Sequence, residues 1–302
     1  MTVRANPRGL HRPFRGGSPG STVTVEPLLC GEARVPPGFL EEEPGPLKWF
    51  RYAGIGVGRS RWRWIPIPAF LITHPTAGRM LVDTGMHPSV ATDPAANLGR
   101  LVARFGEVRL PPEQVLVRQL RDRGIGPEDI RVVLLTHLHF DHASGISQFP
   151  GSTFVCSESE WTAATTVSRP ILHGYRRELF DYAFEYRTID FRRGAIASWS
   201  TFGRTFDLFD DQSVRLAFTP GHTEGHVSVI CRLRDRELVI AGDAVYTHGQ
   251  LDEAPEPPRP EDAHEWRRSA RELSRHREQH PDSVIVAGQD PEQWASLPER
   301  FE

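Results

Sequence analysis

The feature that most constrains this chain is a run of four potential metal ligands within six positions. His137, His139, Asp141 and His142 make up this run, directly after the apolar residues 132–135. A short, β-branched apolar stretch predicts a buried strand, so the ligands lie in the loop where that strand ends. Buried together without a partner they would be costly, and a divalent metal removes that cost. Because imidazole and carboxylate are ordinary zinc ligands, the run indicates a metal site rather than its alternative, a metal-free surface cluster.

Three later segments repeat one design, in which an apolar strand runs into a glycine and then a potential ligand. They end in the pairs Gly221-His222, Gly242-Asp243 and Gly288-Gln289. Loops after strands are where a rigid sheet presents catalytic groups. The repetition therefore predicts that these three side chains join the histidine run in one site.

Hydrophobic periodicity predicts alternating strands and helices along most of the chain. Strands are predicted at residues 68–73, 80–82, 132–135, 153–156, 214–218, 227–231, 238–241 and 284–287, and helices at 112–123, 158–164 and 260–280. We find no repeat and no second core, so residues 22–302 are predicted to form one domain. Residues 1–21 are rich in Gly, Pro, Ser and Arg, which predicts a flexible N-terminal segment. The aromatic and basic residues 168–205 suggest an insertion near the site.

Composition excludes several classes of protein. The 36 basic and 39 acidic residues give a formal charge of -3, which provides no general positive field for nucleic acid. Three widely spaced cysteines fit neither a disulfide framework nor a CxxC metal site, so we expect reduced core thiols. No apolar stretch reaches the roughly 20 residues of a membrane span, and the N-terminus lacks the apolar core of a secretory signal. We therefore expect a cytoplasmic protein.

The motifs taken together, in their order, resemble the metallo-β-lactamase superfamily over about residues 22–295. The matching elements are Asp83-Thr84-Gly85, the HxHxDH run, Gly221-His222 and Gly242-Asp243. Within that superfamily, residues 81–86, 136–145 and 242–246 are most similar to the quorum-quenching N-acyl-homoserine lactonases. The resemblance implies a mixed α/β (α+β) fold of four αββα layers, with the site at one edge of the two sheets.

The resemblance also implies a pair of zinc ions, with other divalent metals as alternatives. His137, His139 and His222 would hold the first ion, Asp141 and His142 the second, and Asp243 would bridge them. Asp83 would orient one of the ligand histidines.

Tyr246, three residues after Asp243, matches a tyrosine that these lactonases direct at the substrate carbonyl. The alternative is a tyrosine of the core.

The chain departs from the family pattern at Gln289, where a histidine is expected. An amide oxygen is a weaker zinc ligand than imidazole, so we expect two-metal binding with a weakened second site. Two alternatives remain: His248 or His264 replaces the missing ligand, or the protein works with one metal.

The function implied is hydrolysis of the lactone ring of N-acyl-homoserine lactones by a metal-bound hydroxide. Tyr246 would stabilise the developing oxyanion, and Asp141 would protonate the leaving alkoxide. The alternatives are another ester or thioester hydrolase of the superfamily, such as a glyoxalase-II-like enzyme, and a metal-poor binding protein, which only Gln289 suggests. The expected partner is a small ester or lactone, not nucleic acid, and the oligomeric state is open, a homodimer included.

Overall fold

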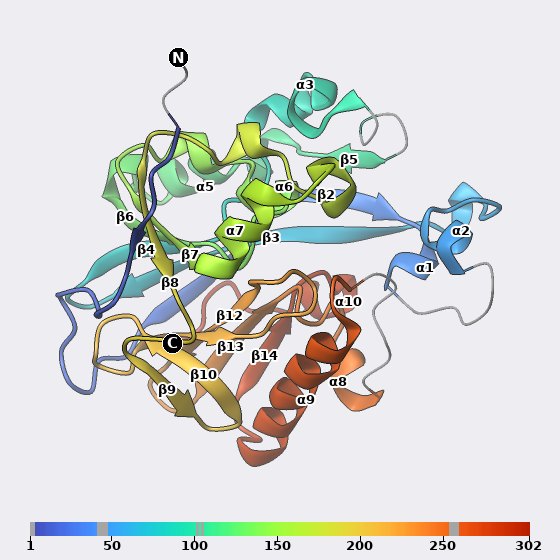
Figure 1. Cartoon of the computed structure of the whole chain (residues 1–302). Helices are drawn as coiled ribbons and strands as arrows, with labels where there is room; N and C mark the ends of the chain where they lie inside the picture. Colours follow the sequence, from blue (N-terminus) through green and yellow to red (C-terminus); the bar gives the residue numbers. More distant parts are fainter. Residues whose placement is uncertain (1–3, 41–47, 101–102, 104–105, 254–259) are drawn as a thin grey trace.

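Two β-sheets lie face to face at the centre of the computed structural model, with helices on the outer side of each (Figure 1). It describes residues 4–40, 48–100, 103, 106–253 and 260–302, and only the backbone of residues 48, 49 and 253. The strands of the larger sheet are β1 (Arg8–Gly9), β2 (Thr24–Val35), β3 (Arg63–His74), β4 (Gly78–Val82), β5 (Glu107–Arg109), β6 (Ile130–Leu134), β7 (Thr153–Ser157) and β8 (Glu185–Ile189). The strands of the smaller sheet are β9 (Ile196–Trp199), β10 (Phe202–Asp207), β11 (Val214–Phe218), β12 (Val227–Arg232), β13 (Glu237–Gly242) and β14 (Val284–Ala287).

The strand order of each sheet places the ends of several strands at a common edge. The larger sheet has the order β1-β8-β7-β6-β4-β3-β2-β5, in which β4, β6, β7 and β8 are parallel. The smaller sheet has the order β14-β13-β12-β11-β10-β9. Strands β11 and β13 both run antiparallel to β12, and β14 runs parallel to β13. Strands β11, β13 and β14 therefore end at the same edge.

The helices are short apart from one. They are α1 (Pro37–Leu40), α2 (Lys48–Tyr52), α3 (Pro94–Leu98), α5 (Leu116–Asp122), α6 (Phe140–Ala143), α7 (Glu158–Thr166), α8 (Gln250–Glu253), α9 (Ala263–Gln279) and α10 (Pro291–Trp294). The 3-10 turns are η1 (Arg59–Arg61), η2 (Pro88–Ala91), η3 (Pro112–Gln114), η4 (Pro127–Asp129), η5 (Ile146–Gln148), η6 (Pro170–His173) and η7 (Arg177–Leu179). Among the described residues, no helix has the length and apolar character that crossing a membrane requires.

Apolar side chains alternate between the two faces of the strands, and this alternation creates the layers. In β13, Leu238 and Ile240 point into the core between the two sheets, whereas Val239 and Ala241 pack in a separate core with Trp266 of α9. A third core joins the outer face of the larger sheet to α5 and α7. Because successive side chains of a strand face opposite sides, each sheet needs a partner on both faces. The four-layer αββα fold predicted from the sequence is confirmed.

Helix α9 shows how local sequence produces the outermost layer. The Asp262 side chain accepts hydrogen bonds from the backbone N–H groups of His264 and Glu265, which caps the first turn. Trp266, Ala270 and Leu273 are buried at helical spacing. The helix predicted at residues 260–280 is therefore confirmed, although its first residues form the cap.

The N-terminal segment differs from the predicted flexible arm. Strand β1 pairs in parallel with β8, and the Leu10 N–H donates to the Thr188 carbonyl. Further along, the Phe14 N–H donates to the carbonyl of Leu208, which follows β10. The described residues 4–21 thus form a strap over both sheets that covers the edge of β8. Flexibility is the wrong prediction for these residues, because backbone pairing needs no apolar periodicity in the sequence.

The end of this strap is held by the buried carboxylate of Asp211. Its Oδ2 accepts hydrogen bonds from the Ser18 N–H at 3.0 Å and from His74 Nε2 at 3.0 Å, and its Oδ1 accepts one from the Ser213 N–H. Burial opposes ionisation, but these hydrogen bonds outweigh it and lower the pKa of Asp211 to about 2. The ionised carboxylate therefore stabilises the fold above its ordinary pKa, and this contribution is lost as the pH falls towards 2.

Candidate metal centre

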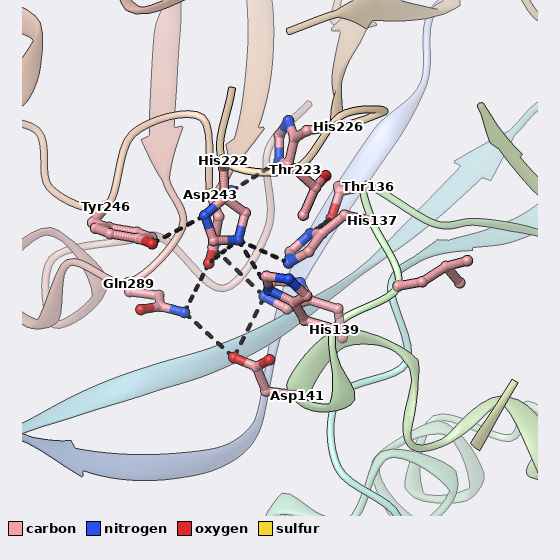
Figure 2. A network of polar contacts seen from close by, with 12 residues as sticks. Thr136, His137, His139, Asp141, His222, Thr223, His226, Asp243, Tyr246 and Gln289 are labelled. Carbon is pink, nitrogen blue, oxygen red and sulfur yellow. Dashed lines mark hydrogen bonds and ion pairs between the residues drawn. The ribbon is translucent and has the colours of Figure 1, made fainter. Parts of the chain in front are cut away.

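The loops that carry the predicted ligands meet at one end of the two sheets. His137, His139 and Asp141 follow β6, while Asp243 follows β13 and Gln289 follows β14. Figure 2 shows the side chains converging from these separate loops. The strand–glycine–ligand pattern recurs in the sequence because these strands all end at the same edge.

Three imidazoles form the first ligand set. Nε2 of His222 lies 3.3 Å from Nε2 of His137 and 3.1 Å from Nδ1 of His139. Burial, together with the neighbouring histidines, lowers the pKa of His137 and His222 well below the ordinary value, so both rings are neutral. A single electrophile between these three nitrogens could accept a lone pair from each of them. This donor set therefore fits a zinc ion.

Carboxylates dominate the second ligand set. Asp243 directs Oδ2 towards His222 Nε2 at 3.4 Å and Oδ1 towards His142 Nε2 at 3.5 Å, which is the arrangement of a bridging carboxylate. Asp141 Oδ2 lies 3.7 Å from His142 Nε2. Within the described part of the chain, His142 Nε2 and Asp243 Oδ1 are buried without a hydrogen-bond partner. These orphaned atoms fit a second cation.

The charge around His142 also favours a cation. Burial lowers the pKa of this histidine, but the carboxylates of Asp141, Asp243 and Asp83 outweigh burial and raise it to about 10. The protein without metal therefore holds a proton at a position where a bound cation would satisfy the same negative potential.

Hydrogen bonds fix the orientation of the ligand rings. Asp83 Oδ2 accepts a hydrogen bond from His142 Nδ1 at 2.8 Å, as expected for a residue that orients a ligand histidine. Thr136 Oγ1 donates to the same carboxylate at 2.7 Å, so it accepts from His137 Nδ1 at 3.0 Å. A protonated Nδ1 leaves the Nε2 lone pair of each ring free for a metal.

Gln289 lies within the second ligand set. Its Nε2 donates to Asp243 Oδ2 at 3.0 Å and to Asp141 Oδ2 at 3.4 Å, while its Oε1 is buried without a partner among the described residues. Neither His248 nor His264 belongs to a convergent ligand group in the described chain, and the His264 side chain is 80% exposed. The geometry therefore gives no support to a substitute histidine.

Tyr246 fits both roles that the sequence left open, because its hydroxyl faces the site while its ring is packed in the core. Its hydroxyl lies 3.0 Å from His222 Nδ1, at the wall of the site. The residue is only 5% exposed, and its ring stacks on Phe39, with centroids 5.4 Å apart and an interplanar angle of 20°. Burial, reinforced by the charge of Asp243, raises the pKa of Tyr246 well above its ordinary value, so the hydroxyl keeps its proton near neutral pH.

Two buried residues of the site were missed from the sequence. His226 Nε2 accepts a hydrogen bond from the backbone N–H of Asp243 at 3.0 Å, and burial lowers the pKa of this histidine to about 3. The available signal was a second Gly-His pair, Gly225-His226, soon after the first. The other residue is Glu160 of α7, which reaches the ligand loops from behind; burial raises its pKa to about 7 although it accepts several hydrogen bonds.

A cavity of about 220 Å³ opens over the ligand sets. Apart from the site residues, its lining comes from Phe39, Tyr52, Phe140, Glu261 and residues 171–174. The predicted insertion at residues 168–205 is therefore correct only in part. Its first residues border the cavity, but β8 and β9 are strands of the two sheets.

Sequence comparison agrees with this fold. A family model described as the metallo-beta-lactamase superfamily matches residues 62–285. The chain belongs to this superfamily and shares its fold.

Several curated relatives are similar over most of the chain. N-acyl homoserine lactonase AttM from Agrobacterium fabrum is 34% identical over 235 residues, which are 77% of this chain and 85% of AttM. AiiB, an N-acyl homoserine lactonase from the same organism, is 30% identical over 255 residues, which are 79% of this chain and 84% of AiiB. A probable metallo-hydrolase from Mycobacterium tuberculosis is 30% identical over 239 residues, and the match covers 74% of each chain.

Solved structures share the architecture at lower identity. A variant of B. thuringiensis AiiA with N-decanoyl-L-homoserine bound at its active site has a TM-score of 0.73 at 21% identity, covering 92% of this chain and 97% of that one. AidC, described as a dizinc quorum-quenching lactonase, has a TM-score of 0.59 at 14% identity, covering 96% of this chain and 92% of its own. These similarities support the fold.

The first ligand set predicts the effect of removing one imidazole. His139→Ala should lower the metal content of the purified protein and abolish its hydrolytic activity, because only two imidazoles of the set remain. Elemental analysis and an activity assay measure both effects. His264→Ala is the control, since its exposed side chain lies outside both ligand groups, and it should keep metal and activity. Full metal and turnover in His139→Ala would show that the ligand assignment is wrong.

Proposed function

We propose that this chain is a metal-dependent hydrolase that opens the lactone ring of N-acyl-homoserine lactones. The observation that carries the proposal is the Tyr246 hydroxyl, which lies beside the first ligand set at the wall of the cavity. Two relatives named N-acyl homoserine lactonase, which match most of the chain at 30% identity or more, support the same substrate class.

The residues of the site would form two metal-binding sites that share one ligand. His137, His139 and His222 would hold one zinc ion, Asp141 and His142 a second, and Asp243 would bridge them. Two zinc ions bound in this way polarise an ester carbonyl and make water nucleophilic near neutral pH.

Tyr246 is suited to act on the carbonyl oxygen. A His222 ring that offers Nε2 to a metal carries its proton on Nδ1, so Nδ1 donates to the Tyr246 oxygen. The phenol proton is then free to be donated to the oxygen that gains charge as the carbonyl is attacked. The stack on Phe39 keeps the ring in this orientation.

Asp141 is suited to complete the reaction. Its carboxylate borders the cavity and contacts the Gln289 amide and His142. Water adds to the carbonyl carbon while Asp141 takes up one of its protons, the ring C–O bond breaks, and Asp141 passes that proton to the leaving alkoxide. One water molecule is consumed, and the product is the open hydroxy acid.

In this proposal, Gln289 weakens the binding of the second metal ion. Its amide N–H group points at the two carboxylates, where a histidine would offer a lone pair. Binding of the second ion would require the amide to turn its Oε1 inwards and lose both hydrogen bonds. We therefore propose a tight first ion and a weaker second one.

The substrate class can be tested with purified, zinc-loaded protein and a panel of homoserine lactones, thioesters and β-lactams. Incubation with an N-acyl-homoserine lactone should give a product heavier by one water that closes again in acid, as chromatography with mass detection would show. His139→Ala is the inactive control. Efficient thioester cleavage without lactone opening would favour a glyoxalase-II-like enzyme, and binding without turnover would favour a non-catalytic protein.

The role of Tyr246 predicts a loss of turnover without loss of the fold. Tyr246→Phe keeps the ring on Phe39, and kcat should fall by about a hundredfold, the usual effect of removing an oxyanion donor. Tm should change little. Tyr186→Phe is the matched control, because the Tyr186 hydroxyl bonds the Phe180 carbonyl in the core. It should lower Tm and leave kcat unchanged, whereas equal kcat in wild type and Tyr246→Phe would assign Tyr246 to packing alone.

Replacing the unusual ligand should tighten the second metal. Gln289→His should raise the affinity for the second ion and reduce the dependence of turnover on added zinc, because imidazole is a better zinc ligand than an amide. Calorimetric titration after chelation measures both binding steps. Gln289→Ala separates gain of a ligand from loss of the amide: it removes the competing N–H donors but supplies no lone pair, so it should tighten binding less than Gln289→His does. Identical titration curves for wild type and Gln289→His would mean that position 289 does not face the metals.

A further inference from the structure

We infer that Glu160 is a positioning residue for the first ligand set, because one buried carboxylate ties two of its loops together. The inference rests on the metal centre of the proposed function but not on the lactone substrate. Glu160 lies in α7, outside both convergent ligand groups and outside the lining of the cavity. It therefore acts through the ligands and does not touch substrate.

Each oxygen of the carboxylate is bound to a different part of the site. Oε1 accepts from the Leu138 N–H at 2.8 Å, and Leu138 lies between His137 and His139. Oε2 accepts from Thr223 Oγ1 at 2.6 Å, and Thr223 is the neighbour of His222. The loop after β6 and the loop after β11 belong to different sheets, so this carboxylate fixes their separation.

Tyr175 adds a second route from Glu160 to the ligands. Its hydroxyl donates to Glu160 Oε1 at 3.1 Å, and its ring packs on that of His139 with centroids 5.0 Å apart. The preceding Gly174 accepts a hydrogen bond from the Phe140 N–H. A side chain at Gly174 would place Cβ 2.7 Å from the His139 ring, so this close approach requires glycine.

The start of α7 is fixed to the same loop independently. Ser157 caps the helix by accepting from the Glu160 N–H at 2.9 Å, and its Oγ donates to the Gly225 carbonyl at 2.7 Å. The Gly225 N–H donates back to Glu160 Oε2 at 3.2 Å. Glu160 is thus held through both its backbone and its side chain, and the side chain contacts Thr223, the neighbour of His222.

The hydrogen-bond donors around Glu160 explain why a carboxylate occupies this position. All four partners are donors, and two of them, Leu138 and Gly225, are backbone N–H groups of irregular loops that lack other described acceptors. A buried carboxylate is retained only where such donors compensate its desolvation. A carboxylate has two acceptor oxygens, whereas an amide has only one.

Glu160→Gln tests the inference with a side chain of the same shape. In either orientation the amide NH₂ faces one backbone N–H, that of Leu138 or that of Gly225, although the hydroxyls can rotate. The affinity of the folded protein for its first zinc ion should fall about 10- to 100-fold, as for other residues that support metal ligands. Chelator competition measures the affinity, and the spectrum of the cobalt-substituted protein should shift as the ligand geometry changes.

Asp211→Asn is the matched control, because Asp211 is also a buried carboxylate but binds the N-terminal strap. It should lower the Tm of the metal-free protein and leave zinc affinity unchanged. If Glu160→Gln behaves in the same way, the positioning role is wrong and Glu160 only stabilises the fold. These readouts do not involve lactone turnover, so they remain decisive even if the substrate assignment fails.

If Glu160→Gln does not fold, a second pair of variants tests the positioning role of Glu160. Thr223→Val removes one hydroxyl donor to Glu160, whereas Thr223→Ser keeps it. Zinc affinity should fall several-fold in Thr223→Val and return in Thr223→Ser. Equal affinity in the two variants would overturn the inference.

Discussion

The structure depends on three imidazole nitrogens that point at one another from loops of two different sheets. An ordinary apolar core would not hold three polar ring nitrogens so close together. Each ring is therefore fixed by a partner on its far side or by packing. Thr136 binds His137, Tyr246 binds His222, and Tyr175 packs on His139. Holding the rings in this arrangement lowers the stability of the metal-free protein, and binding of a metal would offset that loss.

The two ligand sets differ in charge, and Gln289 is the residue that makes the second set the weaker one in our proposal. The first set consists of imidazoles alone, whereas the second places His142 among the carboxylates of Asp83, Asp141 and Asp243. Gln289 adds an amide that donates to two of these carboxylates. The amide partly satisfies them when metal is absent, so a second cation competes with the protein's own hydrogen bonds.

The fold supplies the rigidity that such a site needs. The core between the sheets fixes the strands, and the strand ends bring loops distant in sequence to one edge. Behind the ligands, Glu160 and His226 satisfy the backbone groups of these loops, since the loops cannot pair in a sheet. The N-terminal strap protects an outer edge of the larger sheet and contributes nothing to the ligand sets.

The sequence by itself predicted which residues form the two candidate ligand sets and where they fall. The HxHxDH run and the strand–glycine–ligand segments are local patterns, and so is the alternation that divides β13 between two cores. Only the tertiary structure decided which nitrogen of each histidine faces inward, where the Gln289 amide points, and that Glu160 serves two loops. The physical reason is that these features are contacts between distant segments: Glu160 and Thr223 are 63 positions apart. The pairing of residues 8–9 with β8 was equally invisible, because backbone hydrogen bonds leave no side-chain pattern.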